Sequence, residues 1–304
     1  MDTRPDLLDK KVAVLMGGLS SEREISLRSG EAVLAGLGRR GYHATPIDVD
    51  RSLYEPLKEA RVEVAFIALH GRWGEDGVVQ GLLEMMGIPY TGSGVLASAL
   101  AMDKCLCKIL LESLAIPTPA YKICSSREDC SYSLPFVIKP AREGSSVGIS
   151  IVRAESEIGP AVETAFAYGA KVLIEEYVEG REITVGIVNG NALPIVEVRP
   201  RSGVYDFASK YTKGMTEYLV PAELNGEVER AAQEEALEIW RRFDLAGCAR
   251  IDMIVDHESI PQVIDVNTSP GMTETSLVPK AWEHLGKTFD QLVEEILQGA
   301  GLKA

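Results

Sequence analysis

Two short runs near the carboxyl-terminal end of the chain, residues 250–256 and 263–267, mix charged or amide side chains with apolar ones. Successive side chains of a strand point to opposite faces, so Arg250 and Asp252 are predicted to share one face of the first run. One face of the second run is predicted to carry Val263, Asp265 and Asn267.

The two runs are predicted to pair as a hairpin that turns around residues 258–259. In that register Asp252 lies opposite Asp265, and Arg250 lies opposite Asn267. Carboxylate and amide oxygens suit magnesium or manganese rather than zinc, and magnesium leaves several positions to water and phosphate. The alternative is a hairpin with solvated polar residues. The apolar residues between the acids indicate burial, where unpaired acids are costly, so we prefer a metal site that serves a nucleotide.

Composition limits the function. The chain has 304 residues, of which 46% are hydrophobic and 25% charged, as expected for a globular protein of two or three domains. The net charge of −14 argues against nucleic acid or an anionic membrane as the main partner. The five cysteines form no C-x-x-C pair, and no apolar run reaches the roughly 18 residues of a membrane span. We therefore expect a soluble, cytoplasmic protein.

The elements that would position these side chains fall into two patterns. Buried strands at 11–18, 64–70 and 87–92, with a helix from about residue 22 to 37, predict a parallel α/β sheet within residues 1–103. The rest indicates an α+β fold with antiparallel strands. Its predicted strands are 134–140, 149–152, 172–178, 181–188 and 192–198, and its predicted helices are 227–243 and 289–297.

A glycine-serine loop, residues 141–148, joins two of these strands. Backbone N–H groups and hydroxyls at Gly144, Ser145 and Ser146 could close over phosphates, with the positive charge of Lys139 beside them. An ordinary hairpin loop is the alternative. The sequence holds neither a Walker A motif nor G-x-G-x-x-G, which disfavours a P-loop protein and a dinucleotide-binding dehydrogenase.

Two further segments could serve a nucleotide. Residues 175–182 offer an apolar slot for a base and acidic acceptors for ribose hydroxyls, although a solvated sheet edge explains them equally well. Lys210 and Tyr211 lie in an irregular segment that would suit a lid, although a surface loop is the simpler local interpretation. Among the four histidines, His70 is the one placed for a site, at the end of a buried strand.

Together these segments resemble the D-alanine–D-alanine ligase family of ATP-grasp enzymes, collinearly from about residue 11 to 297. The motifs that carry the resemblance are Gly17-Gly-Leu-Ser-Ser-Glu22-Arg-Glu-Ile-Ser26, Ala68-Leu-His70-Gly-Arg-Trp-Gly-Glu75-Asp-Gly77, Tyr90-Thr-Gly-Ser-Gly94, Met102-Asp-Lys104, Lys139-Pro-Ala-Arg-Glu-Gly-Ser145-Ser-Val-Gly148, Lys210-Tyr211, Arg250-Ile-Asp252 and Asn267-Thr-Ser-Pro-Gly-Met272.

The resemblance implies a three-domain ATP-grasp fold: an N-terminal domain 1–103, a central lid domain 104–181 and a C-terminal domain 182–304. It further implies that ATP phosphorylates the carboxylate of a first D-alanine. The amine of a second D-alanine then attacks the acyl phosphate, and the dipeptide serves peptidoglycan synthesis. The family suggests a homodimer.

The resemblance also assigns residues. The catalytic set is Glu22, Ser145, Tyr211, Arg250, Gly271 and Ser276. The ATP-binding set is Lys104, Lys139, Ser146, Glu175, Tyr177, Val178, Glu182 and Lys210. The amino-acid-binding set is Glu22, His70, Arg250, Ser276 and Leu277, and the ligands of two Mg²⁺ or Mn²⁺ ions are Asp252, Asp265 and Asn267.

Two positions depart from the family pattern. Asp265 stands where the family commonly has a glutamate that bridges two metals, and Glu176 stands where some members have lysine beside the adenine. Three alternatives follow from the sequence: a ligase with D-serine or D-lactate as second substrate, a nucleotide-binding module without turnover, and, least favoured, a dehydrogenase. Tyr211 argues against D-lactate in the family's terms.

Overall fold

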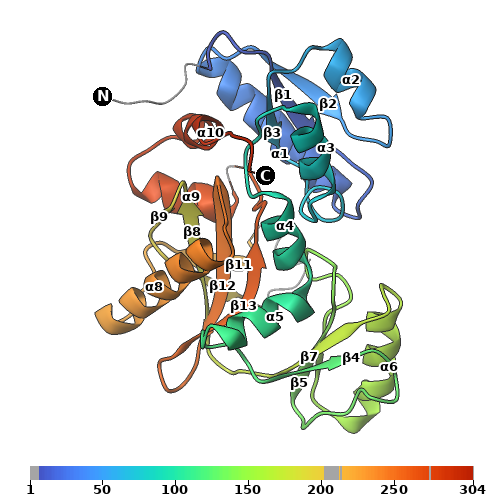
Figure 1. The fold of residues 1–304 in the computed structure, drawn as a ribbon. Helices are drawn as coiled ribbons and strands as arrows, with labels where there is room; N and C mark the ends of the chain where they lie inside the picture. Colours follow the sequence, from blue (N-terminus) through green and yellow to red (C-terminus); the bar gives the residue numbers. More distant parts are fainter. Residues whose placement is uncertain (1–6, 202–211, 213, 274, 304) are drawn as a thin grey trace.

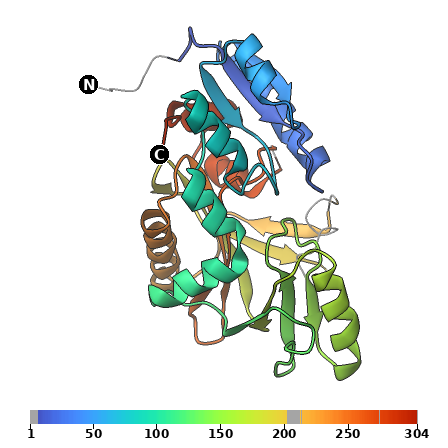
Figure 2. The ribbon, with the colours of Figure 1, turned by 45° about the vertical axis from the view of Figure 1, so that its right-hand side comes forward.

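The computed structural model describes residues 7–201, 212, 214–273 and 275–303. Three sheets follow one another along the chain, but their order in space is different (Figures 1 and 2). The N-terminal sheet lies at one end, the middle sheet of the sequence at the other, and the C-terminal sheet between them. The domain boundaries at residues 103 and 181 stay predictions.

The first sheet is parallel, as predicted, in the order β2-β1-β3. Its strands are β1 (Val12–Met16), β2 (Ala44–Asp48) and β3 (Val64–Ile67). The chain continues from β1 into α1 (Arg23–Arg39), close to the predicted helix. The sequence did not reveal β2, because this edge strand contains Pro46 and is mostly exposed.

The predicted strand at 87–92 is wrong. Only Tyr90 pairs there, through isolated bridges to Ala65 and Gly301. Pro89 has no N–H to donate to a ladder, and Gly87 and Gly92 both have positive φ, so extended pairing stops on either side.

Four helices were not predicted from the sequence; the first lies between β2 and β3, and the other three link this sheet to the next. The four are α2 (Tyr54–Glu59), α3 (Val78–Met86), α4 (Val95–Met102) and α5 (Lys104–Ser113). Helices α4 and α5 pack against the C-terminal sheet through Ala97, Ala101 and Leu111. They therefore carry Lys104 to the boundary between the two later sheets.

The second sheet is antiparallel in the order β4-β7-β5-β6 and is covered by α6 (Glu155–Phe166). Its strands are β4 (Tyr121–Cys124), β5 (Phe136–Pro140), β6 (Ser150–Val152) and β7 (Val172–Glu176). The glycine-serine loop joins β5 to β6, as predicted. Lys139 and Glu175 lie at the ends of neighbouring strands.

The third sheet has the order β11-β10-β8-β12-β13, with the short β9 beside β8. Its strands are β8 (Arg181–Val188), β9 (Asn191–Ala192), β10 (Val196–Pro200), β11 (Thr216–Leu219), β12 (Cys248–Val255) and β13 (Pro261–Asn267). The sheet packs against α8 (Gly226–Arg242) and α9 (Leu277–His284), and α10 (Phe289–Gln298) ends the helical part of the chain. Helices α8 and α10 confirm the two predicted helices.

The hairpin of β12 and β13 has the predicted register. Asp252 pairs with Asp265, and Arg250 pairs with Asn267. A bulge between Asp252 and Met253 breaks the alternation, so Met253 pairs with Val263. Val263 is therefore fully buried in the core, and the prediction that it shares the face of Asp265 is wrong.

None of the helices within the described ranges is long and apolar enough to cross a bilayer.

Candidate active site

A cavity of about 860 Å³ opens where elements of all three sheets meet. It is large enough to hold a nucleotide and small molecules beside it. The predicted site residues that line it are Glu22, His70, Lys104, Lys139, Ser145, Ser146, Glu175, Tyr177, Val178, Glu182, Arg250, Asp252, Asp265, Asn267 and Gly271. The fold thus brings together side chains that the sequence spreads over 250 positions, from residue 22 to residue 271.

The oxygen-rich face of the hairpin is one wall of this cavity. Arg250 lies alongside Asp252, with Nε 2.8 Å from Oδ1 and Nη2 2.7 Å from Oδ2. Thr184 donates to the same carboxylate at 2.5 Å, and Asn267 Oδ1 accepts the backbone N–H of Ser269 at 2.9 Å. These contacts hold the hairpin side chains in fixed orientations.

The same wall fits a hard cation. The described residues include no group of three acidic, histidine or cysteine side chains arranged for a metal. They do offer two facing carboxylates, Asp252 and Asp265, with the amide oxygen of Asn267 beside them. Magnesium commonly takes one or two protein carboxylates and completes its shell with phosphate and water, so this donor set suits a metal that arrives with a nucleotide.

Two lysines face the hairpin. Lys104 donates to the backbone oxygen of Glu143 at 2.8 Å and lies 3.7 Å from the carboxylate of Asp265. Burial lowers the pKa of Lys104, but Asp265 and Glu75 outweigh it and raise the pKa, so the ammonium stays charged. Lys139 forms an ion pair with Glu175 and lies 3.4 Å from the backbone oxygen of Ile264.

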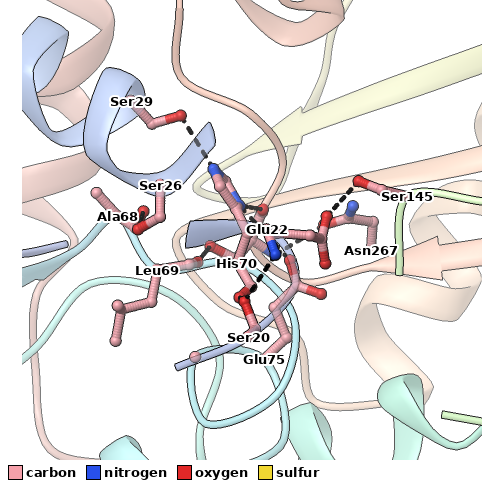
Figure 3. Close-up of polar contacts among 12 residues, drawn as sticks. Ser20, Glu22, Ser26, Ser29, Ala68, Leu69, His70, Glu75, Ser145 and Asn267 are labelled. Atoms are coloured by element: carbon pink, nitrogen blue, oxygen red, sulfur yellow. Dashed lines mark hydrogen bonds and ion pairs between the residues drawn. The ribbon is translucent and has the colours of Figure 1, made fainter. Parts of the chain in front are cut away.

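Glu22 precedes the first turn of α1 and is buried. Its carboxylate accepts a hydrogen bond from the hydroxyl of Ser145, as Figure 3 shows, so two residues of the predicted catalytic set are in direct contact. A side chain at Gly71 or Gly144 would collide with that carboxylate. Both glycines therefore allow the two loops to approach Glu22.

His70 is buried beside this pair (Figure 3). Its Nδ1 lies 2.9 Å from the backbone oxygen of Ser269 and 3.6 Å from Glu75, and its Nε2 lies 3.0 Å from the hydroxyl of Ser29. Burial lowers the pKa of His70, but Glu75 and then Glu22 overcome that effect, and the pKa is raised above its usual value.

The segment predicted to bind the base and the ribose lines the cavity. Tyr177 and Val178 follow β7 and line it, and the Arg153 guanidinium lies 4.5 Å from the centre of the Tyr177 ring. Glu182 lines the same region from β8. The Glu175 side chain is only 1% exposed and lies between lysines, and its predicted role in ATP binding stays a prediction.

Four predicted residues are not placed in the cavity by the structure. Lys210 and Tyr211 lie outside the described residues. Ser276 and Leu277 are not among the described lining residues, but they begin α9, where backbone N–H groups suit a carboxylate. A Cβ added to Gly271 would lie 2.9 Å from Ser276 Oγ, so this helix start lies next to the cavity wall.

The sequence reasoning missed two buried charges near the site. Glu75 belongs to one of the motifs that carry the family resemblance, and it lines the cavity beside His70. Lys108 lies 2.5 Å from Glu175 and is 3% exposed. Lys108 follows Lys104 by one helical turn on the buried face of α5, and this spacing was the available signal.

Comparison with known proteins identifies the family. Two family models match, described as the D-ala D-ala ligase N-terminus over residues 53–93 and the D-ala D-ala ligase C-terminus over residues 114–298. A D-alanine–D-alanine ligase of Syntrophotalea carbinolica is 51% identical, and the match covers 99% of each chain. The chain belongs to the D-alanine–D-alanine ligase family.

Other members of the family agree with this assignment. The D-alanine–D-alanine ligase of Geotalea uraniireducens is 47% identical, with 99% of each chain covered. Two structures of the Bacillus anthracis D-alanine–D-alanine ligase superpose with TM-scores of 0.86 and 0.83, at 36% and 34% identity, over 95% of this chain and 97% of theirs. The second was solved in complex with ATP. The predicted family, ATP-grasp fold and ligase class are confirmed.

Proposed function

We propose that this chain joins two D-alanine molecules into D-alanyl-D-alanine at the expense of ATP, releasing ADP and phosphate, as a step of peptidoglycan precursor synthesis. The observation that carries the proposal is the cavity itself. It combines the Lys104 and Lys139 ammonium groups, the oxygen-rich face of the hairpin and the Glu22–Ser145 pair in one space. The full-length similarity to D-alanine–D-alanine ligases names the reaction.

The first step transfers the γ-phosphoryl group of ATP to the carboxylate of one D-alanine. Phosphoryl transfer depends on alignment and on neutralising negative charge. Lys104 and Lys139 supply positive charge from two sides of the cavity, with Lys210 as a third candidate. Ser146 supplies a hydroxyl from the glycine-serine loop, while Tyr177, Val178 and Glu182 hold the nucleoside.

A divalent ion belongs to this step. When bound with ATP, Mg²⁺ or Mn²⁺ would neutralise charge on the phosphates, held by Asp252, Asp265 and Asn267. Asp265 replaces the longer glutamate of the family pattern and lies 3.7 Å from Lys104. We propose that this shorter side chain suffices, because Asp252 supplies a second carboxylate directly opposite.

The second step forms the amide bond. Glu22 would hold the ammonium of the first D-alanine, and the start of α9 at Ser276 and Leu277 would hold the carboxylate of the second. The amine nitrogen of the second D-alanine attacks the acyl carbon and loses a proton, and phosphate leaves as the acyl C–O bond breaks. Arg250 and the Gly271 N–H would stabilise the oxyanion. His70 and Tyr211 complete the amino-acid sites.

The reaction and the family resemblance also suggest the compartment and the partners of the enzyme. Because it consumes ATP, we propose that the enzyme works in the cytoplasm. Its resemblance to the family further suggests a homodimer and gives no reason to invoke nucleic acid or a membrane.

Purified protein tests the reaction directly. With ATP, MgCl₂ and D-alanine, we expect one phosphate released per dipeptide formed, measured by a coupled phosphate assay and by mass spectrometry. L-alanine serves as the control substrate. ATP binding without any D-alanine-dependent turnover would instead support a nucleotide-binding module.

Competition between D-alanine, D-serine and D-lactate across pH then decides the second substrate. We expect D-alanyl-D-alanine to dominate at every pH. A depsipeptide product would show that Tyr211 does not exclude D-lactate in this chain.

A further inference from the structure

Glu175 is a buried carboxylate shared between two lysines. Lys108 Nζ lies 2.5 Å from Glu175 Oε1, and Lys139 forms an ion pair with Oε2. All three side chains are at least nine-tenths buried, with exposed fractions of 1% for Glu175, 3% for Lys108 and 8% for Lys139. At this depth their charges interact far more strongly than on the surface.

The two lysines differ in what they face. Lys139 lines the cavity, whereas Lys108 is not among the described lining residues. Lys108 comes from α5 and also contacts the Thr118 hydroxyl, which donates to the backbone oxygen of Val263 at 2.6 Å. Lys108 therefore approaches Glu175 from the protein interior and connects α5, β7 and β13.

The charges of this cluster do not cancel. Two ammonium groups and one carboxylate carry a net charge of about +1 when all are ionised. Burial and Lys139 lower the pKa of Lys108 while Glu175 opposes them, and burial raises the pKa of Glu175 while the two lysines overcome it. Without Lys108, the same carboxylate would pair with Lys139 alone and leave a neutral pair at the cavity wall.

We propose that Lys108 is a positioning residue. It neutralises Glu175 from the protein interior, so that the cluster of Lys108, Glu175 and Lys139 keeps a net positive charge and Lys139 stays oriented toward the triphosphate. This inference rests on the proposed function for the identity of the ligand. It assigns Lys108 a part in nucleotide binding, through Glu175, without contact with the nucleotide. The negative phosphates of a nucleotide bound in the cavity would then neutralise the remaining positive charge of the cluster.

Charge-removing variants test the proposal. Lys108→Met should raise the KM for ATP and the dissociation constant of ADP by about tenfold, while kcat changes by less than about threefold, because Glu175 then neutralises Lys139 and weakens its attraction for the phosphates. Adding Glu175→Gln to that variant should bring both constants back to within about threefold of the wild type, since Lys139 then has no carboxylate to neutralise it. Lys108→Gln, which keeps a polar group near Thr118, is the second variant if Lys108→Met does not fold.

The control variant is Lys122→Met, which removes the same charge from β4, at a position paired with Ile174 rather than Glu175. It should leave nucleotide binding unchanged. A double variant that binds ADP no better than Lys108→Met or Lys108→Gln alone would overturn the proposal and leave Lys108 a structural role. ADP binding reports on this inference even if the wild type makes no dipeptide, a result that would overturn the proposed function alone.

Discussion

His70 and Glu75 illustrate how single residues in this cavity act on one another. Their side chains lie 3.6 Å apart, and both are largely buried. A histidine taken out of water alone would become neutral more easily. Here Glu75, with Glu22 beyond it, raises the pKa of His70 despite the burial. Glu75 thus favours the imidazolium form of His70.

Glu75→Gln should lower the pKa of His70 to below the usual value of about 6.5, because burial then outweighs the remaining carboxylate. NMR titration of the imidazole nitrogens measures this directly.

The raised pKa of His70 also predicts the sign of a stability effect. The pair stabilises the wild type fully below pH ~6.5 and loses that contribution as the pH rises through the raised pKa. The difference in denaturation midpoint between wild type and Glu75→Gln should therefore be larger at pH 6 than at pH 9. An unchanged His70 titration would contradict this account.

Helix α5 carries a larger share of the site than the sequence indicated. It begins at Lys104, contains Lys108 and is capped by Asp103, whose Oδ1 accepts the N–H of Leu106 at 3.2 Å. The other oxygen of Asp103 lies 2.8 Å from Arg142 Nε in the glycine-serine loop. One side chain thus orients the helix and connects it to the loop that carries Ser145.

Asp103→Ala should cost about 1–2 kcal/mol of the free energy of unfolding, because a helix cap of this type is lost. Urea denaturation measures the cost. Asp103→Asn keeps an oxygen for the N–H of Leu106 and is the matched control, which should recover most of the loss. Equal losses in the two variants would show that the ion pair with Arg142, not the cap, dominates.

The whole molecule is held together through contacts between sheets. One hydrophobic core joins the N-terminal sheet to α9 and α10, including Phe66, Val278 and Leu292. Arg39 of α1 and Arg40, which follows the helix, add ion pairs to Asp290 and Glu294 of α10, at 2.6 Å and 2.5 Å. The cavity lies where elements of the three sheets meet, so a nucleotide that binds there stabilises the assembled chain.

A non-hydrolysable ATP analogue at about 100 times its Kd should therefore raise the Tm by roughly 5 °C, since such binding contributes about 2.7 kcal/mol. The rise should be larger with MgCl₂ than with EDTA if Asp265 holds the ion with the nucleotide. Differential scanning calorimetry measures both. Asp265→Asn should remove most of the magnesium-dependent part, and an undiminished magnesium effect in that variant would place the metal elsewhere.

Local pattern was sufficient for much of the fold. Apolar runs ending in glycine predicted β1 and the parallel sheet, and helical periodicity predicted α1, α8 and α10. It failed where an element is short or exposed, as for β2 with its proline, and where a proline blocks pairing, as at residues 87–92. Tertiary contacts, rather than local preference, determine those segments.

The sequence by itself determined the chemical types of the site and the register of its hairpin, because strand alternation and the spacing of Arg250, Asp252, Asp265 and Asn267 are local properties. Only the tertiary structure decided which charges meet. The bulge that buries Val263, the pairing of Glu75 with His70 and the sharing of Glu175 between two lysines depend on distances between segments far apart in the chain. Burial makes those distances decisive, because water no longer screens one charge from another.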